Sequence, residues 1–389
     1  MGNARLIRDI AFSYALRAAL RLYCVRPIEK KRVLFVSFRG TRYACNPRYI
    51  SEELHRLAGD GIEIGWAFHE PEKFRYLEKE GIRVLGDRTT EFLRFALTAR
   101  VVCVNGYYKP FMPRRRGQFY LRTWHGGGAY KRVGKYEKLP MLRKMYIGIQ
   151  QQGADLYLSS SRAFTEMTLR DAFGYRGEVL EKGMPRNDML INDHFQIAER
   201  VRAELNIPEN THIALYAPTF RYDEKKEAYA FDFDRVKRAL SERFGGEWVI
   251  AYRGHYLAVK EGEKAQFGDV DVTQYPDMQP LLAAADALFT DYSSSMWDMS
   301  LTHRPVFLYC PDLKEYISAR DFFTDIHTWP FPLSDNGDEL DARIREFDEN
   351  DYRKRVNKHH KELGSYETGC AARAAAERIM KECGLEIKK

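Results

Sequence analysis

The chain has 389 residues, and 44% of them are hydrophobic, so it can bury a large core and its length favours two domains over one. Its formal net charge of +7 indicates anionic partners without choosing among nucleic acid, anionic lipid and a phosphorylated substrate. The six cysteines show neither C-x-x-C spacing nor a dense framework, which predicts reduced thiols in a cytosolic setting. No run of 18 uncharged apolar residues occurs, so no transmembrane helix is expected.

The N-terminal segment, residues 1–30, is basic and amphipathic. Arg17 and Arg21 interrupt the apolar residues at its centre, where a signal peptide would be uncharged, so export is not expected. The pattern fits a helix lying on an anionic membrane surface, and equally a helix packed on its own domain with a solvated basic face. Residues 109–116 and 139–149 also mix cations with apolar side chains, which favours the membrane interpretation.

After this segment, strand and helix patterns alternate. The first series predicts strands at 32–38, 62–67, 84–85, 100–104, 120–124 and 155–159, with helices at 47–57, 71–80, 90–97 and 162–172. A break at 183–188 precedes a second series, with strands at 212–216, 247–253, 270–273, 287–290 and 305–309 and helices at 232–243, 277–285 and 295–302. This alternation predicts an α/β protein with two doubly wound parallel-sheet domains, at 31–185 and 186–335, that face each other across a cleft. Residues 336–389 are expected to form helices that pack across both domains.

The segment 289–298 is the most informative motif, because it predicts a strand, a hydroxyl-rich turn and a helix. Such a turn presents backbone N–H groups, the hydroxyls of Ser293, Ser294 and Ser295, and the positive end of a helix dipole, which together suit a phosphate or pyrophosphate. A serine run before a helix also serves as a plain N-cap.

Two further motifs place imidazoles after strands. His125 follows the strand at 120–124 and precedes a run of three glycines beginning with Gly126 and Gly127, where a ligand can approach the backbone closely. Arg253 and His255 follow the strand at 247–253, and the alternation of an extended chain sends both side chains to one side.

These motifs resemble those of the CDP-glycerol glycerophosphotransferases, which build wall teichoic acids and related polyol-phosphate polymers. The resemblance extends from Val33 to about Ser334. Its landmarks are Ser37-Phe38-Arg39-Gly40, Asn46-Pro47-Arg48-Tyr49-Ile50, Thr123-Trp124-His125-Gly126, Gly183-Met184-Pro185-Arg186-Asn187-Asp188, Tyr216-Ala217-Pro218-Thr219-Phe220-Arg221, Arg253-Gly254-His255-Tyr256, Thr290-Asp291-Tyr292-Ser293-Ser294, Asp312-Leu313-Lys314-Glu315-Tyr316 and Arg320-Asp321-Phe322-Phe323.

The resemblance implies a GT-B-like pair of Rossmann-type domains, of which the first faces acceptor and membrane and the second binds a CDP-activated polyol phosphate. It also implies a prenyl-diphosphate-linked saccharide acceptor and peripheral attachment to the cytoplasmic face of the cell membrane. Three features depart from the family pattern. Glycines follow His125-Gly126 where Thr-Pro is expected, Asp321 stands where glycine is usual, and Phe323 replaces a usual tyrosine.

Transfer of glycerol phosphate requires attack by an acceptor hydroxyl on the glycerol-bearing phosphorus, with CMP as the leaving group. The reaction therefore needs a base and positive charge at the diphosphate. We assign His125 as the general base, because an imidazole titrates near neutrality. Arg253 and His255 are expected to bind the diphosphate or stabilise the charge that grows on CMP, and Ser293 and Ser294 to complete the anion site.

The remaining candidates leave alternatives open. Thr219 and Arg221, after the strand at 212–216, either contact phosphate or polyol or form a turn with a surface cation. Asp291 and Asp298 are either structural or bind a ribose or glycerol hydroxyl.

Metal chemistry has a weaker signal. The D-x-D triplets at 232–234 and 269–271 are of a kind that holds a divalent ion on a diphosphate, but neither lies at a convincing strand-to-helix turn in a chain with 55 acidic residues. No obligatory metal or cofactor is predicted. His359 and His360 lie in a charged segment and are expected to be solvated.

Two other functions compete with the phosphotransferase. A nucleotide-sugar glycosyltransferase would share the two-domain cleft and the diphosphate site. A non-catalytic adaptor would use only the basic surface to bind a membrane or nucleic acid. No RRM, KH or helix-turn-helix signature occurs, so no nucleic-acid partner is expected.

Overall fold

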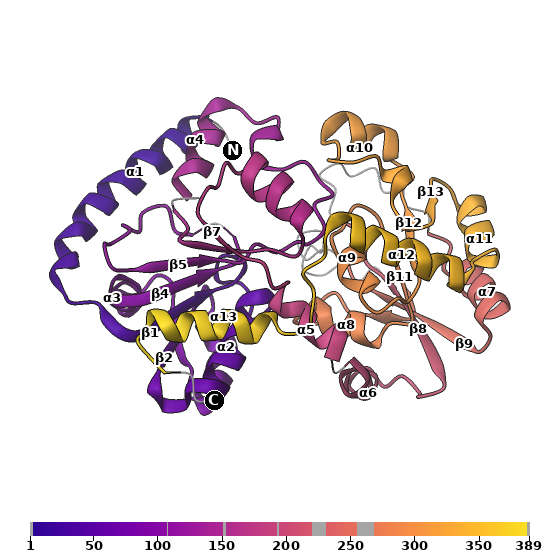
Figure 1. The fold of residues 1–389 in the computed structure, drawn as a ribbon, viewed down its shortest axis with the longest axis horizontal. Coiled ribbons are helices and arrows are strands. Elements are labelled where there is room, and N and C mark those ends of the chain that lie inside the picture. Colours follow the sequence, from indigo (N-terminus) through magenta and orange to yellow (C-terminus); the bar gives the residue numbers. More distant parts are fainter. Residues whose placement is uncertain are drawn as a thin grey trace.

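The computed structural model describes residues 3–106, 108–150, 153–192, 194–219, 231–254 and 268–386. Two separate parallel sheets lie side by side, each packed against helices (Figure 1). The α/β class with two parallel-sheet domains is therefore confirmed.

The first sheet has seven parallel strands in the order β3-β2-β1-β4-β5-β6-β7. The strands are β1 (Glu29–Val36), β2 (Glu63–Phe68), β3 (Arg83–Gly86), β4 (Ala99–Val104), β5 (Phe119–Arg122), β6 (Leu156–Leu158) and β7 (Glu178–Leu180). The apolar runs of β1, β2 and β4 are almost wholly buried, as expected for parallel strands covered on both faces. The strand order reverses between β1 and β4, so the carboxyl ends of these two strands flank the point at which doubly wound sheets bind ligands.

The helices of the first domain are α1 (Asn3–Arg21), α2 (Cys45–Ala58), α3 (Thr90–Thr98) and α4 (Met141–Gln150). Two predicted α-helices are wound differently. Pro71–Glu80 forms 3₁₀ turns, in which Pro71, Phe74 and Leu77 recur every three residues on the inner side. Phe164–Ala172 forms wider π-type turns, in which Phe164, Thr168 and Ala172 are buried at intervals of four.

The second sheet has six parallel strands in the order β10-β9-β8-β11-β12-β13. They are β8 (Thr211–Tyr216), β9 (Glu247–Tyr252), β10 (Val270–Asp271), β11 (Ala287–Thr290), β12 (Val306–Tyr309) and β13 (Leu333–Ser334). The order reverses between β8 and β11. The helices are α5 (Asp188–Asn192), α6 (His194–Glu204), α7 (Phe233–Phe244), α8 (Met278–Ala284), α9 (Ser295–Ser300) and α10 (Leu313–Ala319).

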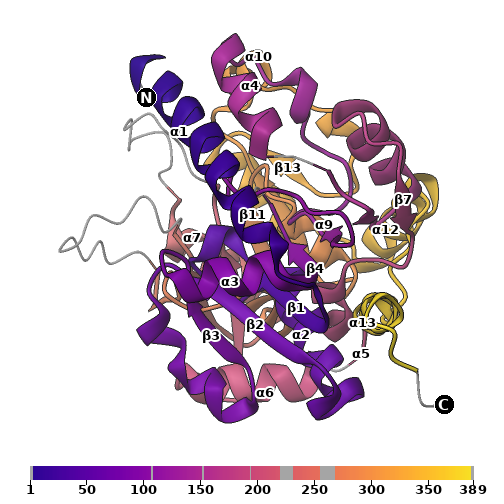
Figure 2. The same ribbon diagram turned by 90° about the vertical axis from the view of Figure 1, so that its left-hand side faces the viewer.

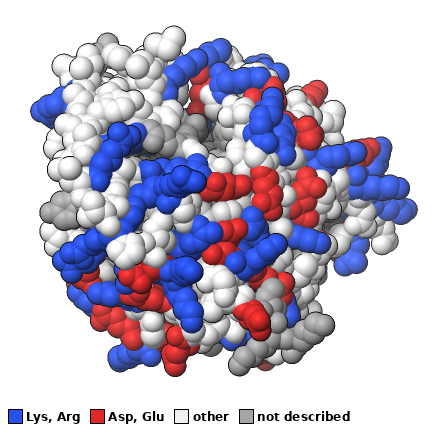
Figure 3. All heavy atoms as spheres, turned by 60° about the vertical axis from the view of Figure 1, so that its left-hand side comes forward, with Lys and Arg blue, Asp and Glu red and all other residues white. Residues whose placement is uncertain are grey.

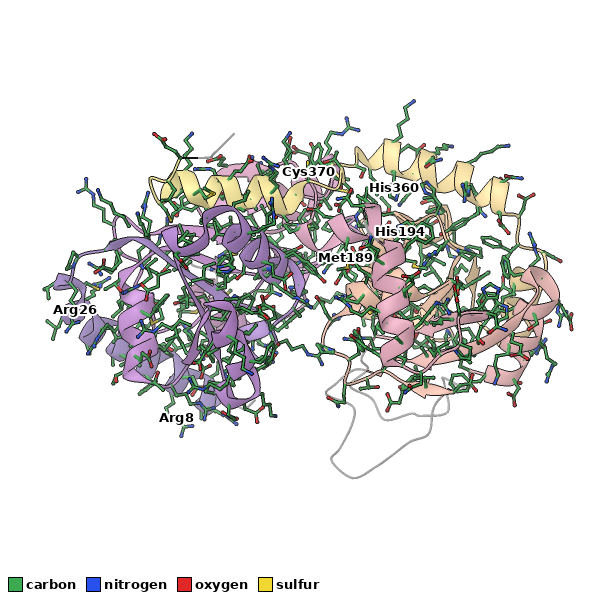
Figure 4. The ribbon with its side chains drawn as sticks, turned by 90° about the horizontal axis from the view of Figure 1, so that it is seen from below. Arg8, Arg26, Met189, His194, His360 and Cys370 are labelled. Atoms are coloured by element: carbon green, nitrogen blue, oxygen red, sulfur yellow. The ribbon has the colours of Figure 1, made fainter. Side chains whose placement is uncertain are left out.

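The C-terminal helices divide between the domains. α11 (Gly337–Arg345) and α12 (Glu349–Leu363) pack on the second domain, whereas α13 (Ala371–Glu382) returns to pack on α2 of the first. Figure 4 shows α12 and α13 above different domains, with Cys370 between them. The Asp188 carboxylate accepts hydrogen bonds from the N–H groups of Ala371 and Ala372, which fixes the start of α13. The chain therefore connects the two domains twice.

The two sides of the N-terminal helix α1 differ in burial. Leu6, Ser13 and Leu20 are buried against the first domain, so the helix packs on its own domain. Its other side exposes 53% of Ile7 and 63% of Phe12. α4 lies beside α1 (Figures 1 and 2). Among the described residues, no helix has the length and apolar character needed to span a membrane. None of the six cysteines, all of which are described, forms a disulfide.

Candidate active site between the two sheets

His125 lies just beyond β5 and is held by a backbone carbonyl. Its Nδ1 is 2.9 Å from the carbonyl oxygen of Asn105, which follows β4. A carbonyl oxygen only accepts hydrogen bonds, so this contact requires Nδ1 to carry the proton in the neutral ring. The Asn105 side chain is itself fixed, because it accepts from the Phe38 N–H and donates to the Ser37 hydroxyl. The arrangement leaves Nε2 as the basic nitrogen of His125.

The surroundings of His125 favour the neutral imidazole. Although the side chain is exposed, the protein around its turn lowers the pKa of His125 below the usual 6.5, chiefly by desolvation. The cations Arg186, Lys131 and Arg39 lower this pKa further, and the hydrogen bond to the Asn105 carbonyl opposes them. The ring is therefore predominantly unprotonated at pH 7, as a general base must be.

The glycine turn after His125 brings the two domains into contact. A Cβ atom at Gly126 would lie 3.3 Å from Ser294 Oγ, and one at Gly127 would lie 2.4 Å from Trp297 Cδ1. The close approach predicted for these glycines is thus made by side chains of the second domain. The structure brings the turn that carries His125 against the turn that carries Ser293 and Ser294.

The serine turn joins β11 to the six-residue helix α9. Ser293 Oγ accepts from the N–H of Ser295, at 3.3 Å, and from its hydroxyl, at 2.9 Å. Ser294 occupies the N-cap position of α9, but its side chain accepts no capping hydrogen bond from the described residues of this helix. Ser293 and Ser294 are both half-buried at the junction of the domains.

Asp291 connects two loops of the second domain. Its carboxylate accepts from the N–H of Thr219, at 3.0 Å, from the Thr219 hydroxyl, at 3.0 Å, and from the N–H of Tyr292. Asp291 is buried. Thr219 and Asp291 therefore connect the loop after β8 to the loop after β11. Of the two roles considered for Asp291, these contacts fit the structural one.

Arg253 directly follows β9. Its guanidinium donates to the carbonyls of Val272, at 3.2 Å, and Tyr275, at 3.0 Å. Desolvation, reinforced by Arg42, lowers the pKa of Arg253 to about 10, so its positive charge persists at pH 7. His255 and Arg221 lie outside the described residues, and their predicted roles stay predictions.

Arg186 is a residue of the junction whose role the sequence did not predict. It is buried, and its guanidinium donates to the backbone carbonyl of His125, at 2.8 Å, and forms an ion pair with Asp298 of α9, at 2.8 Å. Gln279 donates to the same carboxylate. The Arg186 guanidinium thus links the His125 turn of the first domain to α9, the helix that follows the serine turn. Of the two roles considered for Asp298, this ion pair fits the structural one.

Glu367, between α12 and α13, forms a second link. Its carboxylate accepts from the Met184 N–H, the Asn187 side chain and the indole N–H of Trp297, at 2.9–3.1 Å. Desolvation raises the pKa of Glu367 to about 7, although these three donors favour its charged form. Nothing in the local sequence indicates this role.

The expectation that His359 and His360 are solvated is wrong. His359 Nε2 lies 3.0 Å from the Tyr130 hydroxyl, and His360 Nε2 lies 2.7 Å from Ser300 Oγ, while the His360 ring stacks on Trp297 at 4.5 Å. Burial lowers the pKa of each histidine to about 4. The inner side of α12 packs against the aromatic residues of the junction, a contact that the charged composition of α12 does not indicate.

The two D-x-D triplets make contacts within the second domain. Asp232 accepts from the Arg235 N–H at the start of α7, Asp234 and Asp269 pair with Lys237, and Asp271 accepts from the Thr273 N–H. Within the described residues, no group of three or more His, Cys, Asp or Glu side chains is placed to hold a metal ion.

Comparisons with known proteins identify a family and several relatives of this chain. The model of a family described as CDP-Glycerol:Poly(glycerophosphate) glycerophosphotransferase matches residues 18–381. The teichoic acid poly(glycerol phosphate) polymerase of Bacillus subtilis (strain 168) is 29% identical over 339 residues, which are 84% of this chain and 45% of that protein. The teichoic acid glycerol-phosphate transferase of Staphylococcus aureus (strain NCTC 8325 / PS 47) is 27% identical over 372 residues, which are 91% and 94% of the two chains.

The wall teichoic acid polymerase TagF, in a variant soaked with CDPG, has a similar structure. The TM-score is 0.81 at 25% identity, with 98% of this chain and 97% of that chain covered. The likeness therefore includes both sheets and their arrangement. The chain spans about half the length of the Bacillus subtilis polymerase.

Proposed function

The chain belongs to the CDP-glycerol:poly(glycerophosphate) glycerophosphotransferase family, and we propose that it transfers glycerol phosphate, or a related polyol phosphate, from CDP-glycerol to an acceptor hydroxyl. The acceptor is a lipid-linked saccharide or a growing polyol-phosphate chain, and CMP is released. The single observation that carries this proposal is the contact between the His125 turn and the serine turn across the two domains.

The reaction uses His125 as its base. The acceptor oxygen attacks the phosphorus that bears the glycerol, its proton passes to His125 Nε2, and the bond from that phosphorus to the CMP oxygen breaks. The Nδ1 hydrogen bond to Asn105 keeps the ring in the tautomer that can accept this proton. The soaked TagF variant supports a CDP-activated donor for this family fold.

The second domain supplies the positive charge in this proposal. Arg253 keeps its charge at pH 7 and stabilises the CMP phosphate as it leaves, while Ser293 and Ser294 donate to the diphosphate oxygens. His255 and Arg221 are proposed to share this role. No obligatory metal is assigned to the reaction.

The test is a transfer assay with purified protein. CDP-glycerol and CDP-ribitol are each incubated with a synthetic prenyl-diphosphate disaccharide, and products are identified by mass spectrometry. We expect CMP and an acceptor heavier by one or more polyol phosphates. His125→Asn should abolish most of the rate, whereas His327→Asn, a change at an exposed histidine outside the junction, should not. Turnover of UDP-sugars instead of either CDP donor would establish the glycosyltransferase alternative.

We further propose that α1 and α4 attach the protein to the cytoplasmic face of the cell membrane. Phe12 of α1 and Met141 and Met145 of α4 are exposed on neighbouring helices. With the first domain turned forward, Figure 3 shows lysine and arginine side chains spread over the same side of the molecule. Apolar side chains flanked by cations suit an anionic lipid surface.

Sedimentation with lipid vesicles tests this attachment. The protein should bind phosphatidylglycerol vesicles and not phosphatidylcholine vesicles. Phe12→Ser should weaken binding by about 10- to 150-fold, because one buried aromatic side chain contributes about 1.5–3 kcal/mol. Phe195→Ser removes a phenylalanine that is even more exposed, from α6 of the second domain, and should leave binding unchanged. Equal effects of the two changes would contradict the assignment of this face.

A further inference from the structure

Two aromatic side chains flank the imidazole of His125. The indole of Trp124 stacks on the imidazole, with 4.4 Å between the ring centres and 28° between the ring planes. The ring centre of Phe38 lies 6.0 Å from that of His125, at an interplanar angle of 59°. Favourable aromatic pairs have their ring centres roughly 4.5–7 Å apart, so both neighbours are close enough to restrain the imidazole. The proposed base therefore lies beside aromatic rings from two separate turns of the first domain.

The backbone of both aromatic residues is strained. Phe38 has a φ of +44° and Trp124 has a φ of +56°, in the left-handed region that residues with a Cβ atom rarely adopt. Strain of this kind persists only where the surrounding structure enforces it, and it concentrates at active sites. Both rings that flank the proposed base are thus placed by an unfavourable backbone conformation, which indicates that their placement has a function.

Two buried asparagine side chains hold the strained turns. Asn105 Oδ1 accepts from the Phe38 N–H, at 2.8 Å. Asn46 Nδ2 donates to the Trp124 carbonyl, at 3.2 Å. Asn46 is itself fixed, because its Oδ1 accepts from the Arg186 N–H, at 3.1 Å. Buried hydrogen-bond networks whose members have partners are rigid, so the fold sets the positions of both rings before any substrate binds.

The hydrogen bond to Asn105 does not by itself fix the imidazole. It restrains Nδ1 of His125, but the plane of the ring can still turn about that bond. The side chain of His125 is exposed, so core packing does not hold it either. Stacking on Trp124 sets the plane of the ring, and Phe38 restrains the ring from a second turn of the chain. Together these contacts determine the direction in which Nε2 points.

We propose that Trp124 and Phe38 are positioning residues, which hold the ring plane of His125 so that Nε2 faces the acceptor hydroxyl before that hydroxyl attacks. A general base must lie within hydrogen-bond reach of the proton that it accepts, and a displacement of about 1 Å can reduce the rate roughly 10²-fold. Neither aromatic side chain takes part in the proton transfer. This inference rests on the proposed function and adds to it the residues that orient its base.

Leucine substitutions test the two rings, because leucine keeps the Cβ atom, and hence the backbone strain, but removes the aromatic ring. Trp124→Leu should lower kcat about 10- to 100-fold and Phe38→Leu about three- to tenfold, while KM for CDP-glycerol changes about twofold or less. Trp124→Phe should recover most of kcat, because a smaller aromatic ring still stacks. Phe38 is 36% exposed, so Phe38→Leu is expected to fold and decides the question if Trp124→Leu does not.

The tautomer of His125 gives a readout that needs no turnover. Nitrogen-15 NMR of the histidine rings at about pH 8, with His125→Asn to assign the signals, should place the proton on Nδ1 in the wild type. Both leucine variants should populate both tautomers, because a ring that turns freely also donates through Nε2 to water. A general loss of stability would lower the urea midpoint without mixing the tautomers, and that result would contradict the positioning role.

His303→Leu is the matched control. His303 also has a left-handed backbone, with a φ of +57°, but it lies in the second domain, where its Nε2 is 2.7 Å from Asn357 Oδ1. This change should leave kcat and the His125 tautomer as in the wild type. An unchanged kcat in both aromatic variants, a single His125 tautomer in both, or an equal effect of His303→Leu would each overturn the assignment.

The transfer assay separates this inference from the function on which it rests. If the wild type transfers polyol phosphate but the leucine variants keep both kcat and the single tautomer, the positioning role is wrong and the function stands. If the leucine variants mix the tautomers but the wild type uses neither CDP donor, the aromatic residues orient His125 as proposed and the function is wrong.

Discussion

Replacing Gly127 by alanine tests how the two domains meet. The new methyl group would lie 2.4 Å from Cδ1 and 2.8 Å from Nε1 of Trp297, closer than real side chains approach. Trp297 is fully buried, stacks on His360 and donates to Glu367, so it cannot move aside freely. Gly127 has no positive φ, so alanine strains no backbone angle. The expected cost is that of overpacking, about 1–3 kcal/mol.

The assay is urea unfolding followed by tryptophan fluorescence. Gly61→Ala is the control, because nothing lies within 4 Å of its added methyl group. Both substitutions gain a little stability, because alanine restricts the unfolded chain more than glycine does. Trp297→Phe should make room for the methyl group, so the double variant should cost less than the sum of the single changes by about 1 kcal/mol or more. Additive costs, or a Gly127→Ala protein as stable as Gly61→Ala, would refute the described contact.

Three further predictions concern charged groups of the junction. Because desolvation lowers the pKa of His125, the acidic limb of the pH profile of kcat/KM should have its midpoint below pH 6.5, and a midpoint above pH 6.5 would argue against this base. His125→Asn should reduce kcat by about 10²–10⁴-fold. Burial raises the pKa of Glu367 from 4.5 to about 7, so the folded state keeps a proton that the unfolded state releases, and raising the pH through this window destabilises the fold by at most about 1.4 kcal/mol per unit. The unfolding free energy of Glu367→Gln minus that of the wild type should therefore rise from pH 4.5 to 7 and then level off, whereas a constant difference would show that the pKa is unshifted. Arg186→Gln leaves the buried Asp298 carboxylate without its cation and should cost about 3–5 kcal/mol in urea unfolding, partly recovered by adding Asp298→Asn; a cost below about 1 kcal/mol would contradict the buried ion pair.

The strands that position the site were predictable because they are continuous apolar runs. The ends of β4, β8, β11 and β12 fall within one residue of the predicted ranges. β7 and β13 were not predicted, since these segments of three and two residues are too short to carry a periodic signal. α6 was also missed, because Val201 is its only buried residue and no apolar stripe marks it.

The candidate site was predictable where its chemistry is local. His125 and the serines follow strands directly, so their motifs are readable along the chain. Arg186 contacts His125 and Asp298 across 61 and 112 residues of sequence, and no local pattern encodes such contacts. Asn105 had a readable signal, because it is the polar residue directly after the buried strand β4. Arg186 and Glu367, which link the domains through long-range contacts, were missed, whereas His125 and Arg253, which follow strands, were predicted.

The positions at which the sequence departs from the family pattern lie along one seam between the domains, where residues 127–132 meet residues 321–323 and Trp297. A threonine at position 127 would meet Trp297, and a proline at position 128, whose φ is near −65°, cannot adopt the φ of +82° found there. The turn leads to Lys131, which pairs with Phe322 of the second domain, and the Phe323 N–H donates to the Tyr130 carbonyl.

Asp321 lies on the other side of this seam. Its φ is +64°, a conformation that glycine adopts without cost and that aspartate tolerates better than most residues. Its carboxylate accepts from the Phe322 N–H, at 2.8 Å, and pairs with Arg132, also at 2.8 Å, which holds the strained turn in place. The segments that carry the substituted positions therefore contact each other, because the Arg132 N–H donates to the Asp321 carbonyl and the Phe323 N–H donates to the Tyr130 carbonyl.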